Sequence, residues 1–220
     1  MNILDVQWHD KDELIYRLRT VQLKGKHPVP DNSDLEQTIY PYLDANIQLV
    51  KIRTEFLSLP QTYILQENIQ RIRELKYLLG KMGYNIHELN GYIVFTVEDK
   101  TQPDGVKAYT LMPTVVELSI EADSSPHFLI NDGMHRITDA HISHTIPQMI
   151  LISGVKYPYY AYPIRGGFND VQLREDIPEG FIKKWHRYYP KEEYTKLYRR
   201  FESAFENVGD QRGHFIKPNK

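Results

Sequence analysis

The chain has 220 residues, of which 41% are hydrophobic and 25% are charged, and its formal net charge is −2. A chain of this length can bury a sizeable core, and its near-neutral charge provides no global positive field for non-specific nucleic-acid binding. The absence of cysteine excludes disulfides, thiolate catalysis and cysteine-ligated zinc sites within these residues.

In chain order, the first residues lack the basic start and long apolar core of a signal peptide, and no apolar run approaches the ~20 residues of a membrane span. We therefore expect a cytoplasmic protein that does not cross a membrane. A helix is predicted over residues 10–19, because its apolar residues share one face. After a loop at 24–34, a second helix is predicted over 35–57, with a kink near Pro41.

A third helix is predicted over residues 63–79, where isoleucine and leucine recur at helical spacing and Gly80 follows as a stop signal. Residues 1–83 are thus expected to form a helical N-terminal extension. At the other end, residues 164–220 are expected to form a loop-rich extension with one amphipathic helix at 191–205, which a polar tail follows.

Between these extensions, short β-branched and aromatic runs separated by turn residues predict a series of strands. The strands are expected at 91–98, 106–111, 115–120, 127–131, 146–152 and 159–162. The first two should form a hairpin, and a helix at 134–143 should follow the fourth strand. The sequence therefore predicts an α+β protein whose strands form a core at 84–163.

The most informative stretch of the chain is residues 127–144, where an apolar strand ends in Asn-Asp-Gly and a helix begins at once. Gly133 stands where the backbone must turn tightly or approach a ligand closely. The first amides of a helix lack intrahelical partners, and the helix dipole makes that end electropositive. His135 and Arg136 add hydrogen-bond donors at the same place, so the stretch predicts an anion or phosphate site.

Each residue of this turn also has a purely structural interpretation. Asp132 is expected to cap the helix by accepting hydrogen bonds from its first amides. Gly133 could simply close the turn, His135 could be structural, and Arg136 could pair with Asp132 or Asp139 on the helix surface. The prediction of a binding site rests on the combination of these residues.

Residues 132–136, Asp-Gly-Met-His-Arg after an apolar strand, resemble the Asp-Gly-x-His-Arg signature that opens a helix in the ParB/sulfiredoxin-like superfamily. Leu-Met-Pro at 111–113 before the motif and Ile-Pro at 146–147 after it agree with the same pattern. The resemblance covers roughly residues 91–163. It implies the small mixed sheet of that superfamily, together with a nucleotide site.

Members of this superfamily bind ATP, ADP or CTP at the start of the motif helix; they include sulfiredoxins, free serine kinases, CTP-dependent partition proteins and ParB-like nucleases. By this resemblance, Gly133 and Met134 would offer backbone amides to phosphate, and His135 and Arg136 would bind phosphate oxygens. Asp132 would orient a magnesium ion or the phosphate acceptor. These roles agree with phosphoryl transfer, which depends mainly on positioning and charge neutralisation.

Sulfiredoxins carry a catalytic cysteine where Met134 stands, so their known chemistry is excluded. Free serine kinases also use an acidic residue outside the motif, for which Glu117, Glu121 and Asp123 are the candidates in this chain. The catalytic residues we expect are Asp132, His135 and Glu117. We therefore expect a phosphotransferase of the kinase type that uses ATP or ADP (CTP is a further candidate) with Mg²⁺ and a small-molecule acceptor.

Two alternatives remain open: a ParB-like DNA-binding or nuclease protein, and a non-catalytic nucleotide-binding interaction module. A kinase should present a carboxylate to the motif across a pocket, whereas a module should keep the phosphate cradle without it. A nucleic-acid-binding protein should present a stripe of positive charge, although the net charge does not favour this. The candidates for such a stripe are Arg165, Lys183, Lys184, Arg187, Arg199 and Arg200.

Overall fold

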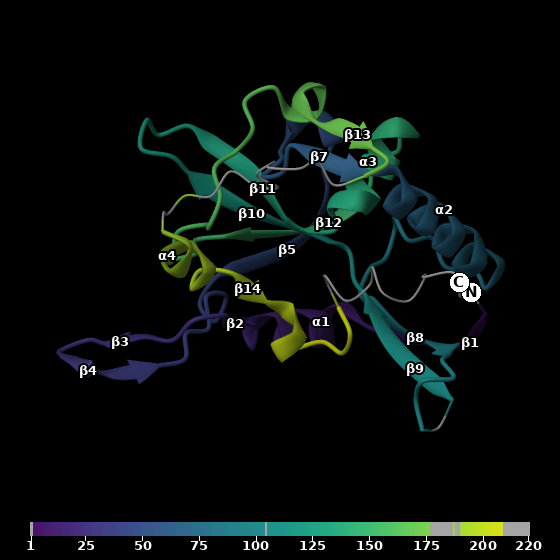
Figure 1. Cartoon of the computed structure of the whole chain (residues 1–220), viewed down its shortest axis with the longest axis horizontal. Coiled ribbons are helices and arrows are strands. Elements are labelled where there is room, and N and C mark those ends of the chain that lie inside the picture. Colours follow the sequence, from purple (N-terminus) through teal and green to yellow (C-terminus); the bar gives the residue numbers. More distant parts are fainter. Residues whose placement is uncertain (1, 104, 177–186, 188–189, 209–220) are drawn as a thin grey trace.

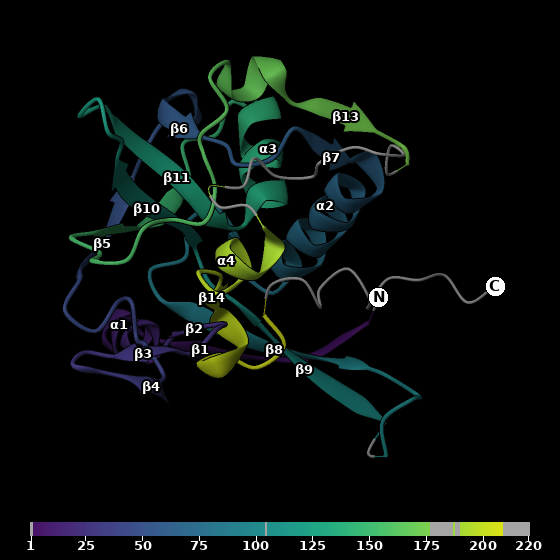
Figure 2. The same ribbon diagram turned by 60° about the vertical axis from the view of Figure 1, so that its left-hand side comes forward.

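The computed structural model describes residues 2–103, 105–176, 187 and 190–208. These residues form a mixed α+β fold around a five-stranded sheet, which Figure 1 and Figure 2 show from two directions. Within the described residues, no helix combines the length and the apolar character needed to cross a membrane.

The central sheet has the strand order β5-β12-β10-β11-β6. The strands span Asn46–Lys51 (β5), Gln148–Ser153 (β12), Thr114–Ile120 (β10), Pro126–Asp132 (β11) and Leu57–Ser58 (β6). β10 pairs with β11 in antiparallel fashion and with β12 in parallel fashion. β5 extends the sheet antiparallel to β12, and β6 extends it parallel to β11.

Apolar side chains cover both faces of this sheet. The helices are α1 (Lys11–Arg19), α2 (Gln66–Lys81), α3 (Met134–Ile142) and α4 (Lys191–Thr195). On one face, Val116 and Ile130 pack in a cluster with Ile137 of α3. On the other face, Val115 belongs to a cluster that includes Leu18 of α1. Side chains alternate along β10, so each residue of this strand is assigned to one face.

A second, smaller sheet has the order β1-β8-β9, and both of its pairings are antiparallel. Its strands span Ile3–His9 (β1), Tyr92–Glu98 (β8) and Val106–Leu111 (β9). Phe95 and Leu111 pack in a cluster with Leu79 of α2, so this helix contributes to the cores of both sheets. Ile69, nearer the start of α2, lies in the cluster of the central sheet.

The last described residues lie along the outer edge of β9. The amide of Thr110 donates to the carbonyl of Glu206 at 3.0 Å, and the Asn207 side chain donates to the carbonyl of Ala108 at 2.8 Å. Val208 is fully buried. The polar tail predicted from residue 207 is therefore packed at its first two residues, and the rest of it lies outside the described residues.

Three two-stranded pairs complete the fold. They are β2 (Gln22–Leu23) with β14 (Arg199–Arg200), β3 (His27–Val29) with β4 (Asn32–Gln37), and β7 (Tyr63–Leu65) with β13 (Gln172–Arg174). Short 3-10 helices span Thr54–Phe56, Gly167–Asp170 and Phe201–Ser203. The β3–β4 hairpin projects from the body of the molecule as an arm (Figure 1).

The structure confirms the elements whose patterns are local. These are the hairpin of 91–98 and 106–111, the strands at 115–120, 127–131 and 146–152, and the helices at 10–19, 63–79 and 134–143, with ends shifted by a few residues. Asp10 caps α1 by accepting from the amide of Glu13 at 2.9 Å. The mixed α+β class is confirmed as well.

The helix predicted over residues 35–57 is wrong. The end of β4, then β5, a 3-10 helix and the start of β6 occupy this stretch. Ile47 is buried and Leu49 packs against the same cluster, while polar Gln48 separates them, which is the alternation of a strand. Pairing with β12 outweighs local helix propensity here, so residues 1–83 are not mainly helical.

Two C-terminal predictions are also corrected. Residues 159–162 do not form a strand; Tyr159 and Tyr160 are buried side chains of an irregular segment. The helix expected over 191–205 ends at Thr195, because the chain then enters β14, where Arg199 pairs with Leu23 of β2. Parts of the predicted loop-rich extension, residues 177–186, 188–189 and 209–220, lie outside the described residues.

Candidate functional site

The turn between β11 and α3 requires glycine. Gly133 has φ 91° and ψ 23°, in the left-handed region, and it is the N-cap of α3. A Cβ added here would lie 2.6 Å from Thr114 Oγ1 and 2.8 Å from Arg136 Nη2. Both the backbone and the surroundings therefore exclude a side chain, and the predicted sharp turn from strand to helix is confirmed.

Asp132 and Arg136 bind each other beneath this turn. Arg136 Nη2 donates to Asp132 Oδ2 at 2.7 Å, and Nη1 donates to the carbonyl of Met112. The Arg136 side chain is only 2% exposed. The guanidinium thus ties the first turn of α3 to the start of β10 from the inside of the molecule, which agrees with the structural alternative of an Asp132 pair.

The prediction that Asp132 caps α3 is wrong. Asp132 is the last residue of β11, and Gly133 occupies the N-cap position. Glycine has no side chain to accept hydrogen bonds from the amides of the first turn. No side chain of the N-cap residue neutralises the electropositive end of α3. A bound anion could accept hydrogen bonds from these amides instead.

The two motif residues after Gly133 differ in their surroundings. Met134 is 9% exposed and its side chain packs in the core cluster of α3, so its backbone is the part that can serve a ligand. His135 is partly exposed, and its Nε2 lies 3.1 Å from Asn68 Nδ2 of α2. Because an amide nitrogen donates, Nε2 accepts, and neutral His135 carries its proton on Nδ1.

One turn further along α3, Asp139 forms the polar contact between α3 and α2. Its carboxylate accepts from Arg73 Nε at 2.8 Å and Lys76 Nζ at 3.4 Å, and it lies 3.3 Å from His87 Nε2. Burial by itself would raise the pKa of Asp139, but the hydrogen bonds and positive charges of these partners outweigh it and hold the pKa well below its usual range. This cluster fixes the helix that carries the motif.

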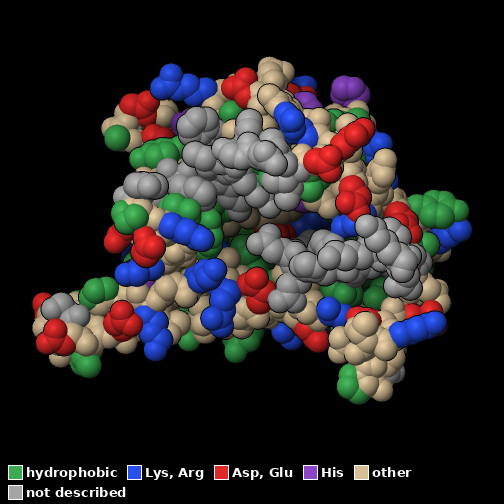
Figure 3. All heavy atoms as spheres, in the orientation of Figure 1, with side chains coloured by type: hydrophobic (Ala, Val, Ile, Leu, Met, Phe, Trp, Pro, Cys, Tyr) green, Lys and Arg blue, Asp and Glu red, His purple; other side chains and the backbone are tan. Residues whose placement is uncertain are grey.

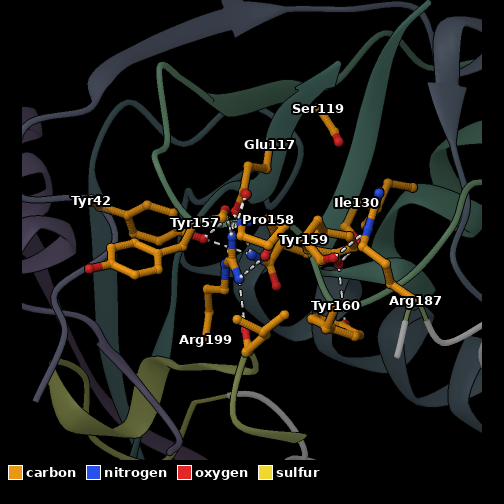
Figure 4. Close-up of polar contacts among 12 residues, drawn as sticks. Tyr42, Glu117, Ser119, Ile130, Tyr157, Pro158, Tyr159, Tyr160, Arg187 and Arg199 are labelled. Atoms are coloured by element: carbon orange, nitrogen blue, oxygen red, sulfur yellow. Dashed lines mark hydrogen bonds and ion pairs between the residues drawn. The ribbon is translucent and has the colours of Figure 1, made fainter. Parts of the chain in front are cut away.

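Glu117, the predicted catalytic acid, lies in a buried ion pair. Arg199 donates to its Oε1 through Nη2 at 2.6 Å and to its Oε2 through Nε at 3.1 Å. Tyr42 and Asn131 donate to Oε2 at 3.0 and 3.3 Å. Figure 4 shows the carboxylate and the guanidinium pointing toward each other, with Tyr159 beside them.

This cluster lies on the face of the sheet away from α3. Glu117 shares its side of β10 with Val115, which packs toward α1. Burial raises the pKa of the Tyr42 hydroxyl well above its usual range, and the neighbouring Glu117 charge adds to the shift. The structure therefore does not bring Glu117 together with Asp132 and His135.

The remaining acidic residues before the motif are remote from the Gly133 turn. Glu121 and Asp123 lie in the turn that precedes β11, at the opposite end of this strand from Gly133. Arg187 binds Glu121 at 2.6 Å. Across the described residues, no group of three or more histidine, aspartate or glutamate side chains is placed to hold a metal ion.

Two of the residues expected to form a stripe of positive charge instead form ion pairs within the protein. Arg199 is buried against Glu117, and Arg187 pairs with Glu121. Lysines 183 and 184 lie outside the described residues, while Arg165 and Arg200 are exposed. Figure 3 shows positive and negative side chains interspersed on the face in view.

Comparison with known protein families agrees with the ParB-like resemblance of the sequence. A family model described as the ParB CE domain matches residues 13–172, which is more than half of the chain. The matched region contains the whole central sheet, α2, α3 and the Gly133 turn. No curated protein and no solved structure matches the chain.

Proposed function

Since this chain belongs to the ParB CE domain family, we propose that it binds the phosphates of a nucleotide at the Gly133 turn. The observation that carries the proposal is the left-handed glycine at the N-cap of α3. It lets the chain turn sharply and leaves the first helical amides without a capping side chain from that position. Backbone donors at the positive end of a helix dipole are a recurrent phosphate site.

The residues of the turn have separate roles in this proposal. The amides of Met134 and His135 contact phosphate oxygens, and the partly exposed His135 ring adds a donor through Nδ1. Arg136 is nearly buried and bound to Asp132, so it supports the turn from within and contributes positive potential, instead of meeting the ligand directly.

The nucleotide we propose is ATP or ADP, with CTP as a further candidate, together with Mg²⁺. Magnesium is usually held by one or two carboxylates and by substrate phosphates, so a cluster of three acidic residues is not required. Asp132, 11% exposed, is the carboxylate of the turn and would hold the ion. The bound ion would neutralise phosphate charge during transfer.

The activity we propose is phosphoryl transfer to a small molecule, with Asp132 and His135 as the catalytic side chains. The burial of Glu117 against Arg199 favours the second candidate, a nucleotide-binding interaction module, because this carboxylate is then not available as the base. The two candidates share the phosphate site and differ in whether nucleotide is consumed.

Calorimetric titration with ATP, ADP and CTP in the presence of Mg²⁺ tests the phosphate site. We expect one nucleotide to bind, and His135→Ala to weaken binding about 10-fold, as for loss of one hydrogen bond to a charged group (about 1.5 kcal/mol). His144→Asn, just beyond the C-terminal end of α3, is the control and should bind as the wild type. The assignment fails if none of the three nucleotides binds. Nucleotide consumption over a panel of metabolites then separates the kinase from the module.

A further inference from the structure

A cavity of about 750 Å³ lies at the end of α3 remote from the Gly133 turn. Small-molecule sites have volumes of roughly 300–1,000 Å³. His141, in the last turn of α3, lines this cavity and stacks on Phe168, with ring centroids 4.0 Å apart. With ~1.5 Å of rise per helical residue, His141 lies about 12 Å along the axis from Gly133. The cavity is therefore distinct from the proposed phosphate site.

Four polar side chains form a hydrogen-bonded chain along this cavity. Asp123 Oδ1 accepts from the Ser125 hydroxyl at 2.5 Å, and Ser125 Oγ lies 3.1 Å from His127 Nε2. On the other side of the ring, Ser58 Oγ lies 3.2 Å from His127 Nδ1. All four residues line the cavity. The parallel pairing of β6 with β11 brings Ser58 to His127, although 69 positions separate them.

The number of protons that each group can donate fixes the direction of these hydrogen bonds. A serine hydroxyl has one proton, and Ser125 gives its proton to Asp123. Ser125 can then only accept from His127, so the proton of the neutral ring is on Nε2. Nδ1 consequently carries the lone pair and accepts the proton of Ser58. The arrangement directs the basic nitrogen of His127 at the Ser58 hydroxyl.

The geometry points to an unassigned catalytic site in which Ser58 is the nucleophile and His127 is the general base. A nucleophile within hydrogen-bond reach of a base, which a third group orients in turn, is the arrangement that activates serine. Ser125 is the positioning residue that holds the tautomer, and Asp123 orients Ser125. The reaction class is hydrolysis of a small carboxylic ester.

In the first step, Ser58 Oγ forms a bond to the ester carbonyl carbon while its proton moves to His127 Nδ1. The carbon–oxygen bond to the leaving group then breaks, and the leaving alkoxide takes the proton from Nδ1, which leaves an acyl group on Ser58. Water attacks the acyl carbon, gives one proton to Nδ1 and displaces Ser58, which regains that proton. The sum is ester plus water giving acid plus alcohol.

The charged side chains that line the cavity indicate the charge of the ester that would bind there. Arg165 lines the cavity and forms no ion pair with any described residue. Two acidic residues of the wall are paired, Glu121 with Arg187 at 2.6 Å and Glu55 with Arg53 at 3.6 Å, and the third, Asp123, accepts from Ser125. Among the residues that line the cavity, Arg165 is the lysine or arginine available to meet a ligand. The substrate is a small ester that carries a negatively charged group elsewhere in the molecule.

A fluorophosphonate probe, which forms a covalent adduct with activated serine hydroxyls, tests the nucleophile. Intact mass and peptide mapping of the full chain should find one adduct, on Ser58. Ser58→Ala should abolish the adduct, and His127→Gln should slow labelling at least 10-fold. Ser153→Ala, at the end of β12, is the control and should label as the wild type. An unlabelled wild type, or an adduct on another serine, overturns the proposal even if the Ser58 variant misfolds.

Hydrolysis of a pair of nitrophenyl esters, one neutral and one with a carboxylate in the acyl chain, tests the substrate class. Arg165→Ala should raise KM for the anionic ester about 10-fold and leave the neutral ester unchanged, and Arg165→Lys should recover part of the loss. Ser125→Ala should lower kcat with KM unchanged, which a merely structural role would not do. Equal effects of Arg165→Ala on both esters refute the selection by charge, and absence of hydrolysis of either ester refutes the site. Labelling and ester hydrolysis are measured without nucleotide, so failure here is separate from failure of nucleotide binding.

Discussion

Arg136 and Arg199 are both buried arginines that bind a carboxylate, but their partners lie at very different distances along the chain. Arg136 binds Asp132, four residues away, and shapes a single turn. Arg199 binds Glu117, 82 residues away, and fastens the C-terminal segment to the central sheet. The Asp132 side chain is 11% exposed and that of Glu117 is 3% exposed.

This difference separates two uses of the same ion pair. The long-range pair has no ligand-facing atoms, so its contribution is to folding, and removal of one partner leaves a charge that water cannot reach. The local pair lies beneath a backbone turn, so its contribution is to the shape of that turn. Substitutions in the long-range pair should therefore affect the free energy of unfolding, whereas substitutions at the turn should also affect nucleotide binding.

The largest effect is expected on breaking the long-range pair. Arg199→Met leaves Glu117 buried without its counter-charge and should lower the free energy of unfolding by about 3–5 kcal/mol in urea titrations. Arg200→Met, the exposed neighbour on β14, should change it by less than about 0.5 kcal/mol. Equal effects of the two would contradict the comparison. Adding Glu117→Leu to Arg199→Met should recover part of the loss.

The next effect concerns the turn. Gly133→Ala introduces a left-handed alanine and a close contact with Thr114, and should cost about 2–4 kcal/mol in thermal or urea unfolding. Gly83 has φ +86° with no atom near an added Cβ, so Gly83→Ala should cost only about 1–2 kcal/mol. Nucleotide binding should fall for Gly133→Ala alone. If Gly83→Ala lowered the free energy of unfolding more than Gly133→Ala, the contact with Thr114 would contribute nothing to the loss at Gly133.

A smaller and pH-dependent effect is expected at Asp139, where solvent reaches two of the partners. Asp139→Asn should cost about 1–2 kcal/mol at neutral pH, since Arg73 and Lys76 are partly exposed. The folded-state pKa is lowered, so the carboxylate stabilises the protein above its unfolded pKa of roughly 4 and this stabilisation is lost as the pH falls below it. Stability curves of the variant and the wild type should converge in acid; parallel curves would refute the assignment.

The smallest effect is expected at the half-exposed Glu13. A hydrogen bond from the Tyr92 hydroxyl at 2.6 Å, followed by contacts with His9 and Arg17, lowers the pKa of Glu13 to about 2. Tyr92→Phe should raise that pKa toward its usual value in an NMR titration. Stability above pH 5 should fall by no more than about 1 kcal/mol. An unchanged titration would show that the other two partners suffice.

Sequence reasoning succeeded where the determining contacts are local. The alternation and turn residues of 91–111 define a hairpin, and the apolar strand before Gly133 defines the strand-to-helix turn. It failed for 35–57, because β5 is specified by pairing with β12, about 100 residues further along the chain. Helical and extended spacing of the same isoleucine and leucine residues cannot be told apart without that partner.

The same limit applies to the sites. Glu117 was a candidate catalytic residue because it lies close in sequence to the motif, and nothing local pointed to its remote partner Arg199. Asp132 was expected to cap the helix because it stands just before it, whereas Gly133 holds the N-cap position and Asp132 pairs with Arg136. Ser58 and His127 carried no shared signal, since only the β6–β11 pairing brings them together. The spacing of residues within one motif can be predicted from the sequence, whereas the pairing of strands that are far apart in the chain cannot.

The packing of Glu206 and Asn207 along β9 has a consequence for the protein in solution. An uncovered edge strand exposes unpaired amides and carbonyls that can recruit a strand from another molecule, and cells and proteins suppress such recruitment in many ways. Here the backbone of Glu206 and the side chain of Asn207 occupy the outward groups of Thr110 and Ala108. At these two positions the β9 edge of the smaller sheet is therefore not available for pairing with a strand of another molecule.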